Sequence, residues 1–164
     1  MITLFKTGLL LFTISLIAFA ISLGGILYQH IVEFPNWGKR IPESLISYRA
    51  FFKHSDFGNF FKIFMPISSI CLLIAIFLLW SKPTEANKWT LIAMAGLILT
   101  AAFTNFYFVP THKKLFSDEI TQTNVSELTT LATQWGKTNL IRIIIMTLTL
   151  ISFLKAYQTI FANR

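Results

Sequence analysis

The stretch that decides the fold is residues 7–28, TGLLLFTISLIAFAISLGGILY, which contains no charged side chain over 22 positions. A helix needs about 20 apolar residues to cross the hydrocarbon core of a bilayer. This stretch therefore predicts a transmembrane helix. Its apolar character continues for eight residues beyond the Ala-Phe-Ala triplet at 18–20, which resembles a signal-peptide cleavage site, and this length favours a membrane span over a cleavable signal peptide.

Three further runs without formal charge follow, at residues 63–80, 89–109 and 143–154. The last is long enough to span only if its helix begins near Thr138 and contains Arg142. No period-2 alternation is present, which excludes a transmembrane β-barrel. We predict an all-α membrane protein, a single transmembrane domain over 1–164. Its four-helix bundle has spans at 7–29, 61–81, 89–109 and 138–158.

The connections between these spans are unequal in length. Two long loops lie on one side of the membrane and one short turn on the other. Loops of this size are usually functional, and we expect short helices within them. Residues 43–53 have an apolar and aromatic face that predicts an interfacial segment, and residues 125–135 are expected to run into the fourth span.

The composition agrees with a membrane location. Hydrophobic residues make up 54% of the chain and charged residues 13%, against about 25% charged in soluble domains, which excludes a water-soluble globule. The single Cys71 excludes a disulfide framework. The net charge of +7 fits anionic lipid at the interfaces, and no basic stripe suggests nucleic-acid binding. Lysine and arginine density favours cytoplasmic termini in an inner or plasma membrane.

Polar residues gather at the long-loop end of the predicted bundle. Helical spacing places Trp135, Asn139, Arg142 and Met146 on one face of the fourth span. It also places Asn105 and His112, seven positions apart, on one face of the third. An arginine inside a span is costly unless it snorkels or pairs. Arg142 is therefore either a headgroup anchor or an inward side chain facing Glu33 or a bound anionic or carbonyl group, and its neighbours favour the inward orientation.

This clustering predicts a small-molecule pocket at the long-loop end. The expected substrate-binding residues are Arg142, Asn139, Asn105, Tyr107, Trp135 and Tyr28. His112 or His30 would act as the base, since imidazole titrates near neutral pH. Without a clear third ligand, histidines that bind no metal are favoured over a metal or haem site, and we expect no cofactor.

Three segments carry a family resemblance: GGILY at 24–28, NFYFVPTHKKL at 105–115 and WGKTNLIR at 135–142. The chain resembles the anthrone-oxygenase-like family of small four-helix membrane proteins, most of which have no assigned function. His112 stands where the family pattern tends to have asparagine. The resemblance implies the four-helix fold and cofactor-free oxygenation of polyketide-like phenolic substrates.

A second hypothesis is a non-enzymatic accessory or scaffold subunit of a membrane complex. On this hypothesis the phenylalanine pairs 51–52 and 60–61 bind a partner, and the polar cluster joins helices. A transporter or channel is a third alternative, which needs oligomerisation. The expected partners are therefore membrane lipid, an apolar small molecule, and a membrane-protein partner or a second copy of the chain.

Overall fold

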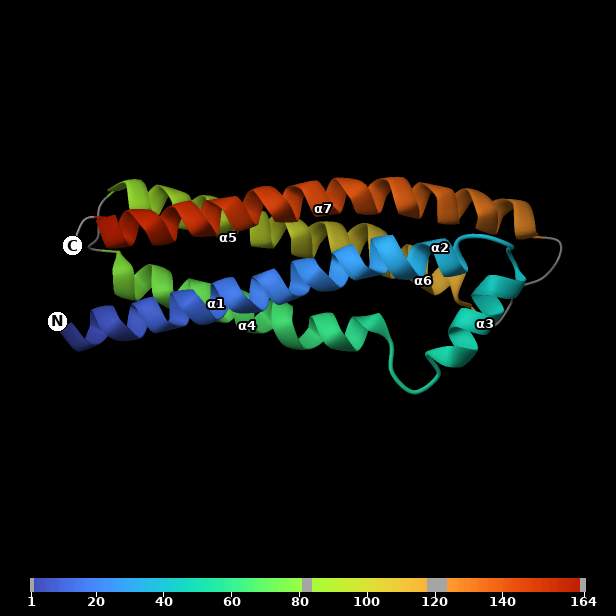
Figure 1. Ribbon diagram of the computed structural model, residues 1–164, viewed down its shortest axis with the longest axis horizontal. Coiled ribbons are helices and arrows are strands. Elements are labelled where there is room, and N and C mark those ends of the chain that lie inside the picture. Colours follow the sequence, from blue (N-terminus) through green and yellow to red (C-terminus); the bar gives the residue numbers. More distant parts are fainter. Residues whose placement is uncertain (1, 81–83, 118–123, 163–164) are drawn as a thin grey trace.

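Four long helices lie side by side in the computed structural model, which describes residues 2–80, 84–117 and 124–162 (Figure 1). They are α1 (Ile2–Tyr28), α4 (Phe57–Leu79), α5 (Thr84–Phe103) and α7 (Val125–Ala162). α1 packs mainly against α4 and α5 against α7, with further contacts between α1 and α7. The structure has no strand among the described residues and four helices able to cross a membrane. The prediction of an all-α four-helix membrane bundle is confirmed.

Shorter elements extend the helices at the long-loop end. A π-helical turn, η1 (Gln29–Glu33), and α2 (Phe34–Trp37) continue α1, whereas η2 (Thr104–Phe108) and α6 (Val109–Leu115) continue α5. α3 (Glu43–Phe51) lies at this end, away from the start of α1 and the end of α7 (Figure 1). The helices are thus longer than the spans predicted for them, and residues 125–135 join the fourth span without a break, as expected.

Both π-helical turns come two residues before a proline, in the first turn of α2 (Pro35) and of α6 (Pro110). A proline has no N–H and its ring collides with the carbonyl four residues earlier. A wider π turn takes up this mismatch and lets the helix continue. We attribute η1 and η2 to these prolines. Both turns bring side chains into the candidate site described below.

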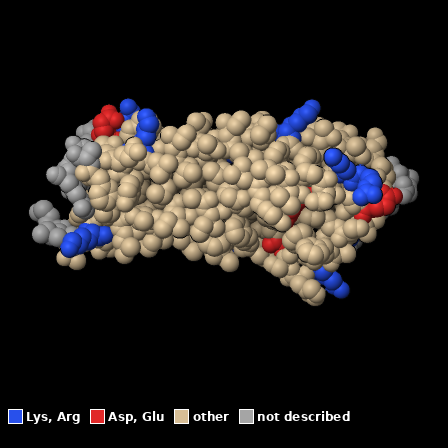
Figure 2. All heavy atoms as spheres, viewed as in Figure 1, with Lys and Arg blue, Asp and Glu red and all other residues tan. Residues whose placement is uncertain are grey.

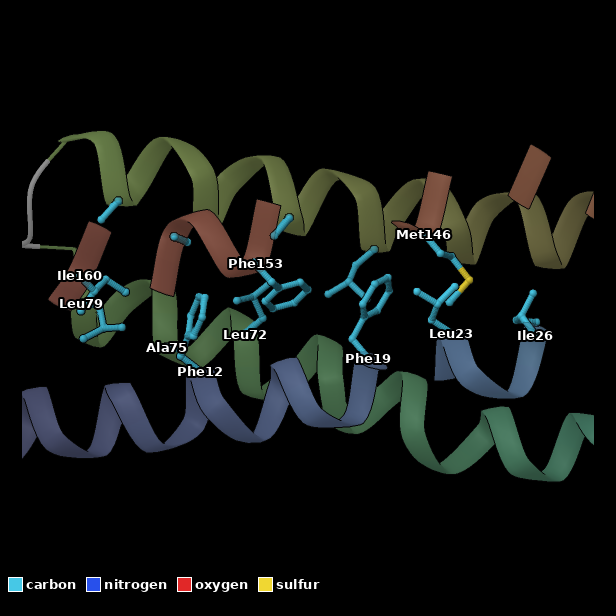
Figure 3. Packing of buried hydrophobic residues seen from close by; sticks show 14 of the residues in the cluster. Phe12, Phe19, Leu23, Ile26, Leu72, Ala75, Leu79, Met146, Phe153 and Ile160 are labelled. Carbon is cyan, nitrogen blue, oxygen red and sulfur yellow. The ribbon is translucent and has the colours of Figure 1, made fainter. Parts of the chain in front are cut away.

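The bundle core is packed with aromatic and aliphatic side chains. Phe153 of α7 lies between Phe12 and Phe19 of α1, with ring centroids 5.6 and 5.5 Å apart, and Leu72 of α4 lies nearby (Figure 3). The outer surface is equally apolar: Leu10, Phe77 and Ile98 are exposed. On the face that Figure 2 shows, charged side chains collect toward the two ends and leave a band without charge between them. This distribution suits a bundle whose flanks face lipid.

Small residues let the helices approach closely, as is common in membranes. A Cβ on Gly96 of α5 would lie 2.1 Å from Oγ1 of Thr149 on α7. Ser15 of α1 and Ser68 of α4 each donate a hydrogen bond to the other's carbonyl oxygen, at 2.7 and 3.0 Å. The first contact lies between α5 and α7, and the second lies between α1 and α4.

Candidate functional site

A second packed region, here called the loop-end cluster, lies at the end of the bundle that carries α3. Its rings come from five elements or their flanking residues: Phe34 and Trp37 (α2), Tyr48 (α3), Phe108 (η2), His112 (α6) with Phe116 after it, and Trp135 (α7). The central contact is between the indoles of Trp37 and Trp135, whose centroids lie 4.9 Å apart in an edge-to-face arrangement. Such pairs fix the relative position of the elements that carry them.

Arg142 lies beside this cluster and is 4% exposed. Its Nε donates to Asn139 Oδ1 at 3.0 Å, and one terminal nitrogen donates both to the same oxygen and, at 3.3 Å, to Gln29 Oε1. The guanidinium carbon lies 3.7 Å from the centroid of Phe108. Arg142 therefore points inward and does not snorkel to a headgroup.

The partners of Arg142 are neutral. Its hydrogen-bond acceptors are amide oxygens and its ring contact is a phenyl group. In the described part of the chain no carboxylate lies within ion-pair distance of it. Glu33, the carboxylate considered from the sequence, instead accepts a hydrogen bond from the Tyr48 hydroxyl. A buried charge normally needs a partner of opposite sign, so the positive charge of Arg142 is left uncompensated by these residues.

Asn139 connects Arg142 to His30. Because its oxygen accepts from the guanidinium, its amino group faces His30 Nδ1, at 3.4 Å, and donates to it. A neutral His30 then has its proton on Nε2. The His30 ring also stacks on Phe34, at 6.1 Å. His30 is thus a held side chain whose Nδ1 lone pair is already engaged.

Three buried nitrogens of the described residues have no hydrogen-bond partner: Trp37 Nε1, Trp135 Nε1 and His112 Nε2. All three belong to the loop-end cluster. His112 packs on Trp135, at 5.6 Å between ring centroids, and Trp135 packs on Phe108, which also contacts the Arg142 guanidinium. The unpartnered His112 Nε2 and the Arg142 guanidinium therefore both belong to side chains that pack against the rings of the loop-end cluster.

α3 covers the cluster through Tyr48 and Leu45. Tyr48 packs on Phe116 with the rings tilted and their centroids 5.1 Å apart, Tyr48 also contacts Trp37, and Leu45 is fully buried. Burial and the hydrogen bond donated to Glu33 raise the pKa of the Tyr48 phenol. The phenol is therefore neutral at physiological pH and acts as a donor.

The structure separates the residues predicted for the site into two groups. It brings Arg142, Asn139, His30, His112 and Trp135 together. Asn105 is exposed and donates to the Ala101 carbonyl of its own helix. It does not share the environment of His112, because the π turn η2 breaks the 3.6-residue period assumed between them.

The other two predicted binding residues make none of the hydrogen bonds described for Arg142. Tyr28 is 53% exposed, and Tyr107 packs on Phe103 and Phe108.

Sequence reasoning missed Gln29, Trp37 and Phe108 as members of the site. The spacing of Phe34 and Trp37, three residues apart with Pro35 between them, gave a weak indication of an aromatic face. Gln29 stood among the polar residues at the long-loop end of the first span, but a helix-period pattern could not place it or Phe108 against Arg142, because both residues lie in the π turns.

Two further observations concern metal binding and open grooves. Within the described ranges no three His, Cys, Asp or Glu side chains group as a metal site requires. An open groove of about 600 Å³ lies at the start of α7. It is lined by Asn124, Ser126, Glu127, Thr130, Leu131 and Gln134. None of these side chains belongs to the Arg142 site.

Comparison with known proteins gives one match. Residues 57–152 match the family described as anthrone oxygenase. The matched region runs from the start of α4 into α7, so it contains His112, Trp135, Asn139 and Arg142 but not Gln29, His30 or Trp37. No curated protein and no solved structure matches the chain. The match covers more than half of the 164 residues, and the chain belongs to the anthrone oxygenase family.

Proposed function

We propose that this membrane protein binds an apolar aromatic carbon acid at Arg142 and oxygenates it without a cofactor. The observation that carries the proposal is the buried guanidinium of Arg142, which is held by two neutral amides and a phenyl ring, with no carboxylate of the described residues within ion-pair distance. The family name supplies the substrate class, an anthrone.

The charge of Arg142 suits an anion formed during the reaction. Removing a proton from the CH₂ group of an anthrone gives an enolate, whose negative charge is concentrated on the carbonyl oxygen. A fixed cation in a water-poor site stabilises such an oxyanion strongly, since the site does not have to reorganise. Asn139 and Gln29 hold the guanidinium in place, and the protein thereby favours the enolate over the neutral ketone.

His112 is the side chain best placed to take the proton. Its Nε2 is buried and unpartnered, whereas the Nδ1 of His30 is engaged by Asn139. In the proposed reaction the substrate C–H bond breaks and its proton moves to His112 Nε2. The resulting carbanion passes electrons to dioxygen, a C–O bond forms, and a second C–H bond and the O–O bond break; the proton on His112 and the proton of the second C–H bond both leave in the water that forms. The balance is R₂CH₂ + O₂ → R₂C=O + H₂O.

The substrate must enter a closely packed region. α3 is a short helix over the loop-end cluster, and its hydrogen bonds include those of Tyr48 to Glu33, Ser44 to the Trp37 carbonyl and Arg49 to the Ser117 carbonyl. We propose that α3 moves aside when the ligand enters from the bilayer. A planar fused-ring substrate then replaces ring contacts of α3 with its own stacking contacts.

Oxygen uptake by the purified protein in lipid nanodiscs tests this proposal. With anthrone as substrate, the wild type should consume one dioxygen per anthraquinone formed, above the uncatalysed rate. Arg142→Gln and His112→Phe should each lose at least 100-fold of that excess rate. Lys155→Gln is the matched control, since Lys155 is a cation packed on Trp89 in the other half of α7. A wild-type rate equal to that of empty nanodiscs would refute the oxygenase proposal.

The alternative is a non-enzymatic subunit of a membrane complex. Close packing of the loop-end cluster and the 81% exposure of Phe51 on α3 are the observations that favour it. It predicts no oxygen uptake, recovery of a larger partner at a fixed ratio, and loss of that partner in Phe51→Ser. Recovery of the protein alone in gentle detergent would count against it.

A further inference from the structure

The unpartnered polar atoms of the protein are not spread evenly. The bundle core contains many buried hydroxyl groups, and each has a hydrogen-bond acceptor: examples are Ser15, Ser22, Thr90 and Thr149. In contrast, the three buried side-chain nitrogens without a partner in the described ranges all lie in the loop-end cluster. Buried polar groups without a partner are rare in folded proteins, so their confinement to one region calls for an explanation, and a bound molecule that accepts hydrogen bonds would supply one.

Two of these nitrogens are indole N–H groups, which can only donate. Trp37 is 1% exposed and Trp135 is fully buried. Their rings pack edge to face, and both also contact Phe34, at 5.1 and 5.4 Å. The two donors therefore belong to one group of packed aromatic side chains, and neither has a hydrogen-bond acceptor there.

We propose that the Trp37 and Trp135 indoles form a second, oxygen-binding position of the site, distinct from Arg142. The ligand class is then a planar aromatic molecule with acceptor oxygens on two edges, as in a quinone or a diketone. One oxygen meets Arg142 and the other meets the indole N–H groups. This inference rests on the proposed function for the choice of a fused-ring ketone as probe.

Nuclear magnetic resonance of the indole groups tests the proposal on the intact protein. The chain has four tryptophans, so ¹⁵N-tryptophan labelling gives four indole N–H signals. Trp80 and Trp89 lie in the other half of the bundle, at the end of α4 and early in α5. They are internal controls, and Trp80→Phe and Trp89→Phe assign their signals without altering the cluster.

The probes are anthraquinone, which has an acceptor oxygen on each of two edges, and anthracene, which has none. Anthraquinone should move the Trp37 and Trp135 signals downfield and leave those of Trp80 and Trp89 in place, whereas anthracene should not cause the downfield change. Trp135→Phe should weaken anthraquinone binding about fivefold, the effect of losing one neutral hydrogen bond, and leave anthracene binding unchanged.

The outcomes separate this inference from the oxygenase proposal. Equal shifts with both probes, no shift at Trp37 and Trp135, or contact of these protons only with bound water would overturn the inference, whatever the oxygen uptake. Indole shifts specific to anthraquinone without any oxygen uptake would support the inference and refute the oxygenase proposal. The spectrum of the wild type decides between these outcomes even if the tryptophan variants do not fold.

Discussion

The change Gly136→Ala tests whether the loop-end cluster is packed as described. A Cβ at position 136 of α7 would lie 2.5 Å from Cζ and 2.6 Å from Cε1 of Phe34, against 3.4–4 Å for an ordinary contact. The ring would have to move by about 1 Å, and it is confined by Trp37, Trp135 and Gly38. Overpacking of this kind costs about 1–3 kcal/mol.

The matched control is Gly24→Ala, because a Cβ there would meet nothing within 4 Å. Replacing glycine by alanine in a helix stabilises each variant by roughly 1 kcal/mol. The difference in free energy of unfolding between the two variants therefore isolates the packing cost at position 136. We expect Gly136→Ala to be less stable than Gly24→Ala by about 2 kcal/mol. The assay is unfolding by sodium dodecyl sulfate in mixed micelles, followed by the helical circular dichroism signal.

A double-mutant cycle with Phe34→Leu completes this test. Leucine lacks the ring carbons nearest to position 136, so Gly136→Ala should cost little or nothing in the Phe34→Leu background. Equal stability of the two glycine variants, or the same cost in both backgrounds, would refute the packing of Phe34 against α7.

Three other changes give shorter tests. Gly96→Ala should destabilise more than Gly136→Ala, because the 2.1 Å contact falls on the β-branched Thr149; Thr149→Ala should recover part of the loss, measured by the same unfolding titration. Ser15→Ala and Ser68→Ala should show a coupling of about 0.6 kcal/mol in a double-mutant cycle, since the two hydroxyl oxygens also lie within hydrogen-bond distance of each other, at 3.2 Å; a coupling of zero would contradict that hydroxyl–hydroxyl bond. The pKa of the Tyr48 phenol is raised, so the neutral phenol stabilises the fold fully at pH values below about 10, the pKa of tyrosine in the unfolded chain. This stabilisation is lost progressively as the pH rises above that value. The free energy of unfolding should therefore fall more steeply above about pH 10 in the wild type than in Tyr48→Phe, and parallel curves would contradict this.

The fold was predictable because its signal is long-range and redundant. Each apolar run is long enough to span a bilayer by itself, so an error of a few residues at its ends leaves the number of spans unchanged. On α7 the same regularity holds over several turns, and Trp135, Asn139, Arg142 and Met146 are all buried, as their spacing predicts. Along a continuous α-helix, residues spaced by three, four, seven or eleven positions stay on the same face.

The site was only partly predictable because the helical period changes at two places, the π turns η1 and η2. Beyond η1 and η2 a face calculated at 3.6 residues per turn no longer describes the helix. Asn105 and His112 therefore lie in different surroundings despite their spacing of seven. Contacts between distant segments, such as Arg142 with Gln29 or Trp37 with Trp135, depend on how α1 and α7 pack, which one sequence does not reveal.

The central claim is that Arg142 stabilises the anion of a bound carbon acid, and anaerobic titration of the protein with anthrone tests it most directly. Without dioxygen the enolate cannot react onward, and its absorption lies at longer wavelength than that of the ketone. We predict a long-wavelength band at neutral pH with the wild type and with Lys155→Gln, saturating at one anthrone per chain, and no band with Arg142→Gln. Bound anthrone that keeps the ketone spectrum, or an equal band with Arg142→Gln, would contradict the account.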